Sequence, residues 1–171
     1  MHKFLEKHIQ GTGYDDLTDI GKEAKPMANK VIEMGLPPIS QYYGTEVTVH
    51  YPGLYAGSTD LVCMHNDMET IADFKQSNRP KREEWIEDYY MQIAAYAMAH
   101  DYVYKSKIRQ GVIMICTPDL YYQEFKFQDA ELRDWKHNFL KRLNMYYELQ
   151  HDEKEQANVG DIDFELDRIV S

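Results

Sequence analysis

The chain has 171 residues, of which 43% are apolar and 13% aromatic, so it can build one hydrophobic core and hence one domain. Its formal charge of −10 argues against a protein that coats nucleic acid nonspecifically, because phosphate binding needs a basic surface. Cys63 and Cys116 lie in apolar runs without a CxxC pair, so the sequence suggests neither a disulfide framework nor a zinc or iron–sulfur site. No apolar run approaches the roughly 18 residues of a membrane span. We expect a soluble cytoplasmic protein without a signal peptide.

The first half of the chain predicts two helices followed by three strands. Residues 2–10 predict a short helix, and residues 19–34 predict a second one with apolar residues at helical spacing. Residues 44–51 alternate between polar and apolar, and residues 54–63 and 68–75 each follow a turn sequence. We therefore expect three antiparallel strands.

The second half predicts a helix, two strands and a last helix. Residues 81–99 predict a helix of about five turns. One of its faces carries Trp85, Tyr89, Gln92 and Tyr96. Residues 111–116 form a continuous apolar run typical of a strand buried on both faces, and residues 121–127 alternate. The last helix, expected to pack on the sheet, is marked by Leu132, Trp135, Phe139, Leu143 and Tyr146.

The end of the chain differs in composition from the rest. Residues 151–171 lose helical periodicity and hold seven acidic residues against two basic ones. We expect one domain over residues 1–150 and an acidic, mobile tail over residues 151–171.

Two acidic residues lie on strands that are expected to pair. If the hairpin is centred between Asn66 and Asp67, Asp60 lies opposite Asp73. Opposed side chains have Cβ atoms about 5 Å apart, and like charges there are destabilising. Lys75 projects from the same face as Asp73 but satisfies the two carboxylates only in part. Two carboxylates and a backbone carbonyl suit Mg²⁺ or Mn²⁺. The alternative is a solvated surface ion pair, which the apolar flanks of both strands disfavour.

These residues carry a resemblance to a known family. The stretches "YAGSTDLV" and "IADFKQSNRPKREEWIEDYYMQIAAYAMA" resemble the RecB-like branch of the PD-(D/E)xK nucleases, which includes the mitochondrial genome maintenance exonuclease and related phage exonucleases. In that family a G-x-x-D strand, a D-x-K strand and a Q-x-x-x-Y helix follow in this order. The matching residues are Gly57 and Asp60, Asp73 and Lys75, and Gln92 and Tyr96.

The resemblance implies a three-layer α/β fold of the restriction-endonuclease type, with a mixed central sheet flanked by helices. It also implies a metal-dependent DNA exonuclease that hydrolyses phosphodiester bonds in single-stranded DNA or at DNA ends. Mg²⁺ or Mn²⁺ would be held by Asp60, Asp73 and the carbonyl of Phe74. The family's H-x-x-x-E helix is matched by His2 and Glu6, which implies His2 as a further metal ligand, with a surface histidine at a frayed helix end as the alternative. The four-cysteine cluster of some relatives is not matched, so we expect no iron–sulfur cluster.

The remaining implied roles concern catalysis and DNA. Lys75 would position or help deprotonate the attacking water, and Gln92 would orient Lys75 or that water, although a Gln bonded to a backbone carbonyl is as good a reading. The candidate DNA contacts are Arg79, Lys81, Arg82, Tyr96, Lys105 and Lys107. Candidate base-stacking aromatics are Tyr42, Tyr43, Tyr121 and Tyr122, for which core packing is the alternative. Two other functions stay open: a noncatalytic nucleic-acid-binding module and a small-molecule enzyme with a similar metal site.

Overall fold

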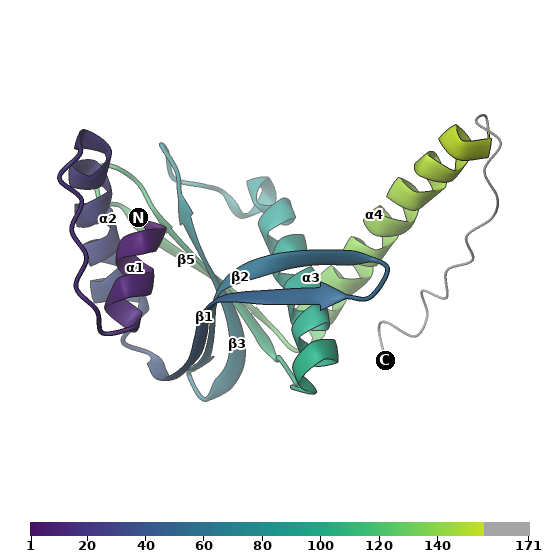
Figure 1. Cartoon of the computed structure of the whole chain (residues 1–171), viewed down its shortest axis with the longest axis horizontal. Helices are drawn as coiled ribbons and strands as arrows, with labels where there is room; N and C mark the ends of the chain where they lie inside the picture. The colour runs from purple at the N-terminus through teal and green to yellow at the C-terminus, as the bar shows by residue number, and fades with distance from the viewer. Residues whose placement is uncertain (156–171) are drawn as a thin grey trace.

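The computed structural model describes residues 1–155, and these form a mixed five-stranded sheet between two layers of helices (Figure 1). The elements in chain order are α1 (His2–Ile9), α2 (Asp19–Gly35), β1 (Ile39–Tyr51), β2 (Tyr55–His65), β3 (Met68–Gln76), a 3₁₀ turn (Glu83–Trp85), α3 (Glu87–Tyr104), β4 (Gln110–Cys116), β5 (Tyr122–Gln128) and α4 (Ala130–Glu155). The predicted three-layer α/β architecture is confirmed.

The strands lie in the order β1-β2-β3-β4-β5, and only β3 and β4 run parallel. A parallel pair needs a crossover connection, which α3 provides. Every residue of β4 is buried, as the continuous apolar run at 111–116 predicts. The site described below therefore lies on a strand, β3, that has the buried β4 at its side.

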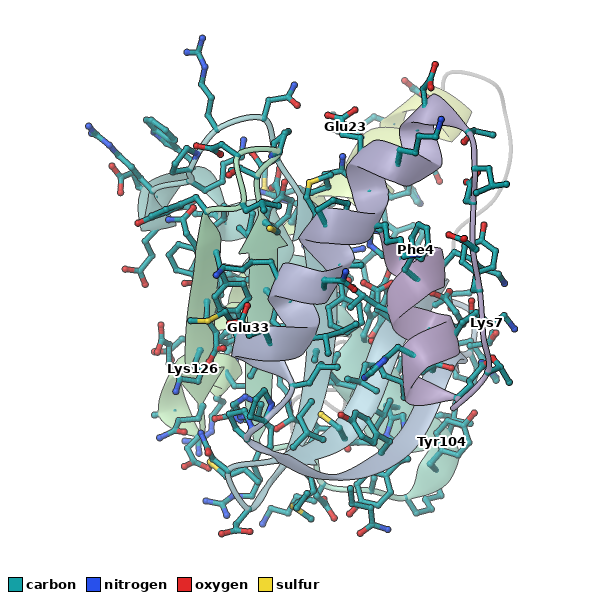
Figure 2. The ribbon with its side chains drawn as sticks, turned by 90° about the vertical axis from the view of Figure 1, so that its left-hand side faces the viewer. Phe4, Lys7, Glu23, Glu33, Tyr104 and Lys126 are labelled. Carbon is teal, nitrogen blue, oxygen red and sulfur yellow. The ribbon has the colours of Figure 1, made fainter. Side chains whose placement is uncertain are left out.

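Each face of the sheet has its own apolar core. Leu61, Ala72 and Phe74 face α1 and α2, while Val62 and Ile71 face α3 and α4. The alternation follows from the period of two along a strand. Figure 2 shows α1 and α2 side by side in front of the first of these faces. In the described part of the chain, no helix is both long enough and apolar enough to cross a membrane.

The crossover helix begins later than the sequence predicts. A 3₁₀ turn occupies Glu83–Trp85, and Ile86 then leaves helical geometry with φ −118° and ψ 21°. The side chain of Ile86 is fully buried, so the chain bends at this point to place it in the core. The predicted helical start at Lys81 is therefore wrong, and Trp85 is 61% exposed instead of sharing a face with Gln92.

Helix α4 packs on α3 and β5, and the Tyr147 hydroxyl in its second half still donates to the Leu54 carbonyl, before the end of the helix projects from the body of the molecule (Figure 1). Leu140 and Leu143 are buried with Met98 of α3. The helix continues through residues 151–155, where the sequence predicts the start of the acidic tail. The rest of that predicted tail, residues 156–171, lies outside the described residues.

Candidate active site

The site forms where β2 and β3 separate. The hairpin turns through Asn66 and Asp67, and its paired residues run from His65 with Met68 to Leu61 with Ala72. This is the register predicted from the sequence. Beyond Leu61 the two strands no longer pair, so the edge of β3 at Phe74 has β4 on one side only. The Phe74 N–H and carbonyl on the other side are then free to bind side chains.

Asp60 fills part of this gap. Its Oδ2 accepts a hydrogen bond of 2.7 Å from the Phe74 N–H. Burial acts to raise the pKa of Asp60, but hydrogen bonds with His2, Asp73 and the Phe74 N–H outweigh it, and the pKa is lowered. Asp60 is therefore the carboxylate that carries a stable negative charge.

Asp73 lies on the same side of the sheet as Asp60 and is only 3% exposed. Burial raises the pKa of Asp73 to about 7, and the charge of Asp60 and a hydrogen bond shared with it act in the same direction. The Lys75 ammonium opposes this shift in part. The two carboxyl groups thus lie close enough to interact directly, and below pH 7 they share one proton between them.

His2 reaches the same gap from the other layer of the molecule. Its Nε2 donates to the Phe74 carbonyl at 2.5 Å and lies 3.5 Å from Asp60 Oδ2. The hydrogen bond with Asp60 raises the pKa of His2, against the effect of burial. Glu6, its expected companion, instead contacts Lys3 and Gln10 on the surface. Of the predicted H-x-x-x-E pair, only His2 is brought to the site.

Lys75 is oriented by α3. Its Nζ lies 2.7 Å from Asp73 Oδ2 and donates to Gln92 Oε1 at 3.0 Å. Gln92 Nε2 in turn donates to the Tyr96 hydroxyl at 3.0 Å. The Lys75 ammonium also lies 4.9 Å from the centroid of the Tyr89 ring. Of the two readings of Gln92, the one that orients Lys75 is therefore the one that fits, and Tyr96 contributes to this network.

Close approach of β2 to α3 depends on Gly57. A Cβ atom at this position would lie 2.5 Å from Cε1 of Tyr96. The glycine of the G-x-x-D strand and the tyrosine of the Q-x-x-x-Y helix are therefore in direct contact. This contact holds the Asp60 strand against the helix that positions Lys75.

The donor set fits a hard divalent cation. In residues 1–155, no group of three His, Cys, Asp or Glu side chains has the geometry of a metal cluster. Mg²⁺, however, is commonly bound by one or two carboxylates together with water, and Asp60, Asp73 and the Phe74 carbonyl supply three oxygens. Asp73 Oδ2 is buried, and apart from its ion pair with Lys75 it has no hydrogen-bond partner among the described residues. A cation would satisfy this atom.

The candidate DNA contacts fall into two separate groups. Arg79 and Lys81 follow β3 and line a cavity of about 350 Å³ with Tyr89, which is next to Lys75. The Lys81 N–H donates to Gln123 Oε1 at 2.7 Å, which ties this loop to β5. Arg82 forms an ion pair with Glu84 and lies over the ring of Trp85.

Lys105 and Lys107 lie at the other end of the sheet. They precede β4, whose first residue pairs with Thr70, whereas Lys75 pairs with Ile115. Five residues of strand separate these pairs, or about 16 Å. The two basic groups therefore do not border the same site.

The four candidate stacking aromatics have different environments. Tyr42, Tyr43 and Tyr121 are 41%, 49% and 52% exposed. The Tyr122 hydroxyl donates to Glu124 at 2.7 Å, and its ring packs on the core beneath α2, so Tyr122 serves packing. Sequence reasoning placed Tyr89 on the right helix face but missed its contact with Lys75. The signal that could have revealed this contact is the spacing of three residues between Tyr89 and Gln92, which places Tyr89 next to the residue that binds Lys75.

Comparison with known proteins supports the fold. No family model matches the chain, and no curated protein matches it. The crystal structure of a "Putative exonuclease" from Eubacterium rectale aligns with 96% of this chain and 75% of its own, at 11% identity and a TM-score of 0.56. At this identity the likeness shows a shared, nuclease-like fold. A structure of the protein SSO0001 aligns with 84% of this chain and 82% of its own, at 15% identity and a TM-score of 0.39, too low to carry an argument.

Proposed function

We propose that the protein is a Mg²⁺- or Mn²⁺-dependent nuclease of the RecB-like branch of the PD-(D/E)xK nucleases, and that it hydrolyses phosphodiester bonds in DNA. The observation that supports this most is the convergence of Asp60, Asp73 and Lys75 at the gap between β2 and β3. A buried acid with a raised pKa beside a second carboxylate is typical of functional sites. The nuclease-like fold agrees with this assignment.

The site residues would divide the work. Asp60, Asp73 and the Phe74 carbonyl would hold the cation, with His2 as a further ligand once its proton has left. When bound, the cation would supply Lewis acidity toward a phosphate oxygen and lower the pKa of a nearby water. Lys75, held by Gln92, would hold or accept the proton of the attacking water and face the charge that develops on the phosphate.

The way in which Lys75 is held favours a catalytic protein over a noncatalytic nucleic-acid-binding module that keeps only the nuclease fold. A binding module needs no partly buried lysine held by a carboxylate and an amide, because phosphate contacts can come from Lys and Arg side chains at the surface. Lys75 is instead fixed between Asp73 and Gln92 with the Tyr89 ring beside it. Such fixed geometry is what a group that acts on a reacting atom requires.

The finer parts of the proposal concern the substrate. Action as an exonuclease on single strands or DNA ends rests on the sequence resemblance. Arg79 and Lys81, in the cavity beside Tyr89, are placed to bind a phosphate next to the scissile one. This position suits a DNA strand whose backbone runs along the loop after β3.

Cleavage of labelled single-stranded and blunt duplex DNA, with Mg²⁺, Mn²⁺ or EDTA, tests the proposal. We expect metal-dependent cleavage by the wild type and loss of at least 100-fold in rate for Asp73→Asn and Lys75→Ala. Asp67→Asn, the same chemical change in the exposed hairpin turn, serves as the matched control and should cleave normally. Metal-dependent cleavage that survives both site substitutions would contradict the proposal.

A further inference from the structure

A second cavity, of about 630 Å³, lies between the end of α3, the loop before β4 and the first turns of α4. Its basic lining residues are Lys105, Lys107, Arg109, Arg133 and Lys136. Asp101 and Asp129 are its acidic lining residues. The lining therefore carries a formal charge of +3 in a chain whose formal charge is −10. Cations from two segments far apart in the sequence, residues 105–109 and the first turns of α4, converge here.

Both carboxylates of the cavity already have partners. Asp129 accepts from Arg109 Nε at 3.2 Å and Nη2 at 3.3 Å. Asp101 Oδ1 accepts from Ser106 Oγ at 2.7 Å and from the Ile108 N–H at 2.9 Å. Each carboxylate is thus committed to holding the wall of the cavity in place.

The other cations are left without a carboxylate. Among residues 1–153, no acidic oxygen forms an ion pair within 4.0 Å with Lys105, Lys107, Arg133 or Lys136. Lys136 is partly buried, and burial lowers its pKa while Asp101 acts to raise it. Holding several like charges together costs free energy, and a bound anion would offset that cost.

The cavity wall is ordered before any ligand arrives. Asp101 fixes the loop through Ser106 and Ile108, and Lys105 takes a left-handed conformation with φ 54° at the end of α3. The Lys105 ammonium lies 4.9 Å from the centroid of the Tyr102 ring, which holds it over the cavity edge. Pre-ordered donors lose less entropy on binding than flexible ones.

We infer that this cavity binds a ligand through its phosphate groups. The fully ionised phosphate is the common anion with enough charge and acceptor oxygens for several Lys and Arg side chains. The volume lies within the range of about 300 to 1,000 Å³ typical of small-ligand sites. Two sources share this chemistry: the backbone of a nucleic-acid strand and a free nucleotide. The inference does not depend on the proposed nuclease activity, because the cavity lies at the far end of the sheet from Lys75.

The test compares two double variants with the same loss of charge. Lys107→Gln with Lys136→Gln changes the cavity. Lys7→Gln with Lys141→Gln is the control, because these two lysines also lack an acidic partner within 4.0 Å among the described residues and lie outside the cavity. Binding of a fluorescein-labelled single-stranded 20-mer is measured by anisotropy in EDTA, between 50 and 200 mM NaCl. EDTA prevents hydrolysis, so binding is read alone.

We expect the cavity variant to bind about tenfold more weakly at 100 mM NaCl. Its slope of log K against log salt should be shallower by about 1.4, or about 0.7 for each lost phosphate contact. The control should stay within twofold of the wild type. Competition by ATP and by inorganic triphosphate then identifies the source: displacement of the 20-mer indicates a free nucleotide, and failure to displace it indicates a strand.

Equal binding by the two double variants would overturn the inference. Two controls detect a loss of binding that is caused by misfolding. The unfolding temperatures of both double variants are measured, and the single change Lys107→Gln, at an exposed side chain, is tested by itself. A single change that leaves affinity and salt slope at wild-type values, together with a misfolded double variant, would also count against it.

Discussion

Replacing Asp73 by Asn should stabilise the metal-free protein, and more so at high pH. Asn has the shape of a protonated Asp and can still donate to Asp60, but it cannot ionise. The pKa of Asp73 is raised from 3.8 to about 7 by burial and by the charge of Asp60. A carboxyl whose folded-state pKa is raised destabilises the fold as pH rises, because the unfolded chain loses the proton more easily.

The magnitude follows from the two pKa values. Below about pH 3 both states are protonated, and Asp73 contributes almost nothing. At pH 5 ionisation in the unfolded state costs the fold about 2 kcal/mol, and above pH 7 the cost levels off at about 4 kcal/mol. The Asn variant avoids this cost, so its advantage over the wild type should roughly double between pH 5 and pH 8.

Urea denaturation in EDTA at pH 5 and pH 8 measures this difference. Asp67→Asn is the control, because Asp67 is exposed in the hairpin turn and Asn tolerates its left-handed φ of 60° equally well. The control should stay within about 0.5 kcal/mol of the wild type at both pH values. An Asp73→Asn variant that is less stable than the wild type at pH 8, or whose advantage is the same at both pH values, would refute the reasoning.

Three further predictions concern metal, packing and the end of the chain. Millimolar Mn²⁺ should raise the unfolding temperature of the wild type and of Lys75→Ala, but not that of Asp73→Asn, because only Asp73→Asn removes a metal ligand. If calorimetry shows that Mn²⁺ leaves the unfolding temperature of the wild type unchanged, the assigned ligands are wrong. Gly57→Ala should cost about 1 to 3 kcal/mol and reduce cleavage, because its Cβ meets the Tyr96 ring at 2.5 Å, and urea denaturation checks it. Removal of residues 156–171 should leave the unfolding temperature unchanged and cleavage unchanged or raised, since this segment carries four acidic residues and one basic one.

The register of the central hairpin could be predicted because it depends on local features. Asn66 and Asp67 both take left-handed conformations, with φ 48° and 60°, as a two-residue hairpin turn requires. Once the turn is fixed, the period of two along each strand places Asp60 and Asp73 on one face. The candidate site was readable from the sequence for this reason.

What could not be predicted depends on contacts between distant segments. His2 meets Phe74 across 72 positions of sequence, and no periodicity reports such a contact, so His2 could be placed at the site only through the family resemblance. The late start of α3 depends on burying Ile86, a tertiary effect that overrides helix propensity. Lys105 and Lys107 could be named as candidate DNA contacts because they are basic, but their distance from Lys75 follows from the parallel pairing of β3 and β4, which the sequence does not report.

This separation leads to a last prediction. Helix α3 has 18 residues and is therefore about 27 Å long, and its two ends lie near the two basic groups. A trinucleotide spans about 10 Å at 3.4 Å per nucleotide, and even stretched to twice that length it is too short to bridge them. The cavity variant, Lys107→Gln with Lys136→Gln, should therefore cleave a trinucleotide with wild-type kcat/KM. Arg79→Gln with Lys81→Gln should raise KM on the same substrate, because these cations border Lys75 through Tyr89. The reasoning is refuted if the cavity variant loses as much kcat/KM on the trinucleotide as Arg79→Gln with Lys81→Gln. Both basic groups would then bind the same part of the substrate, despite their separation along the sheet.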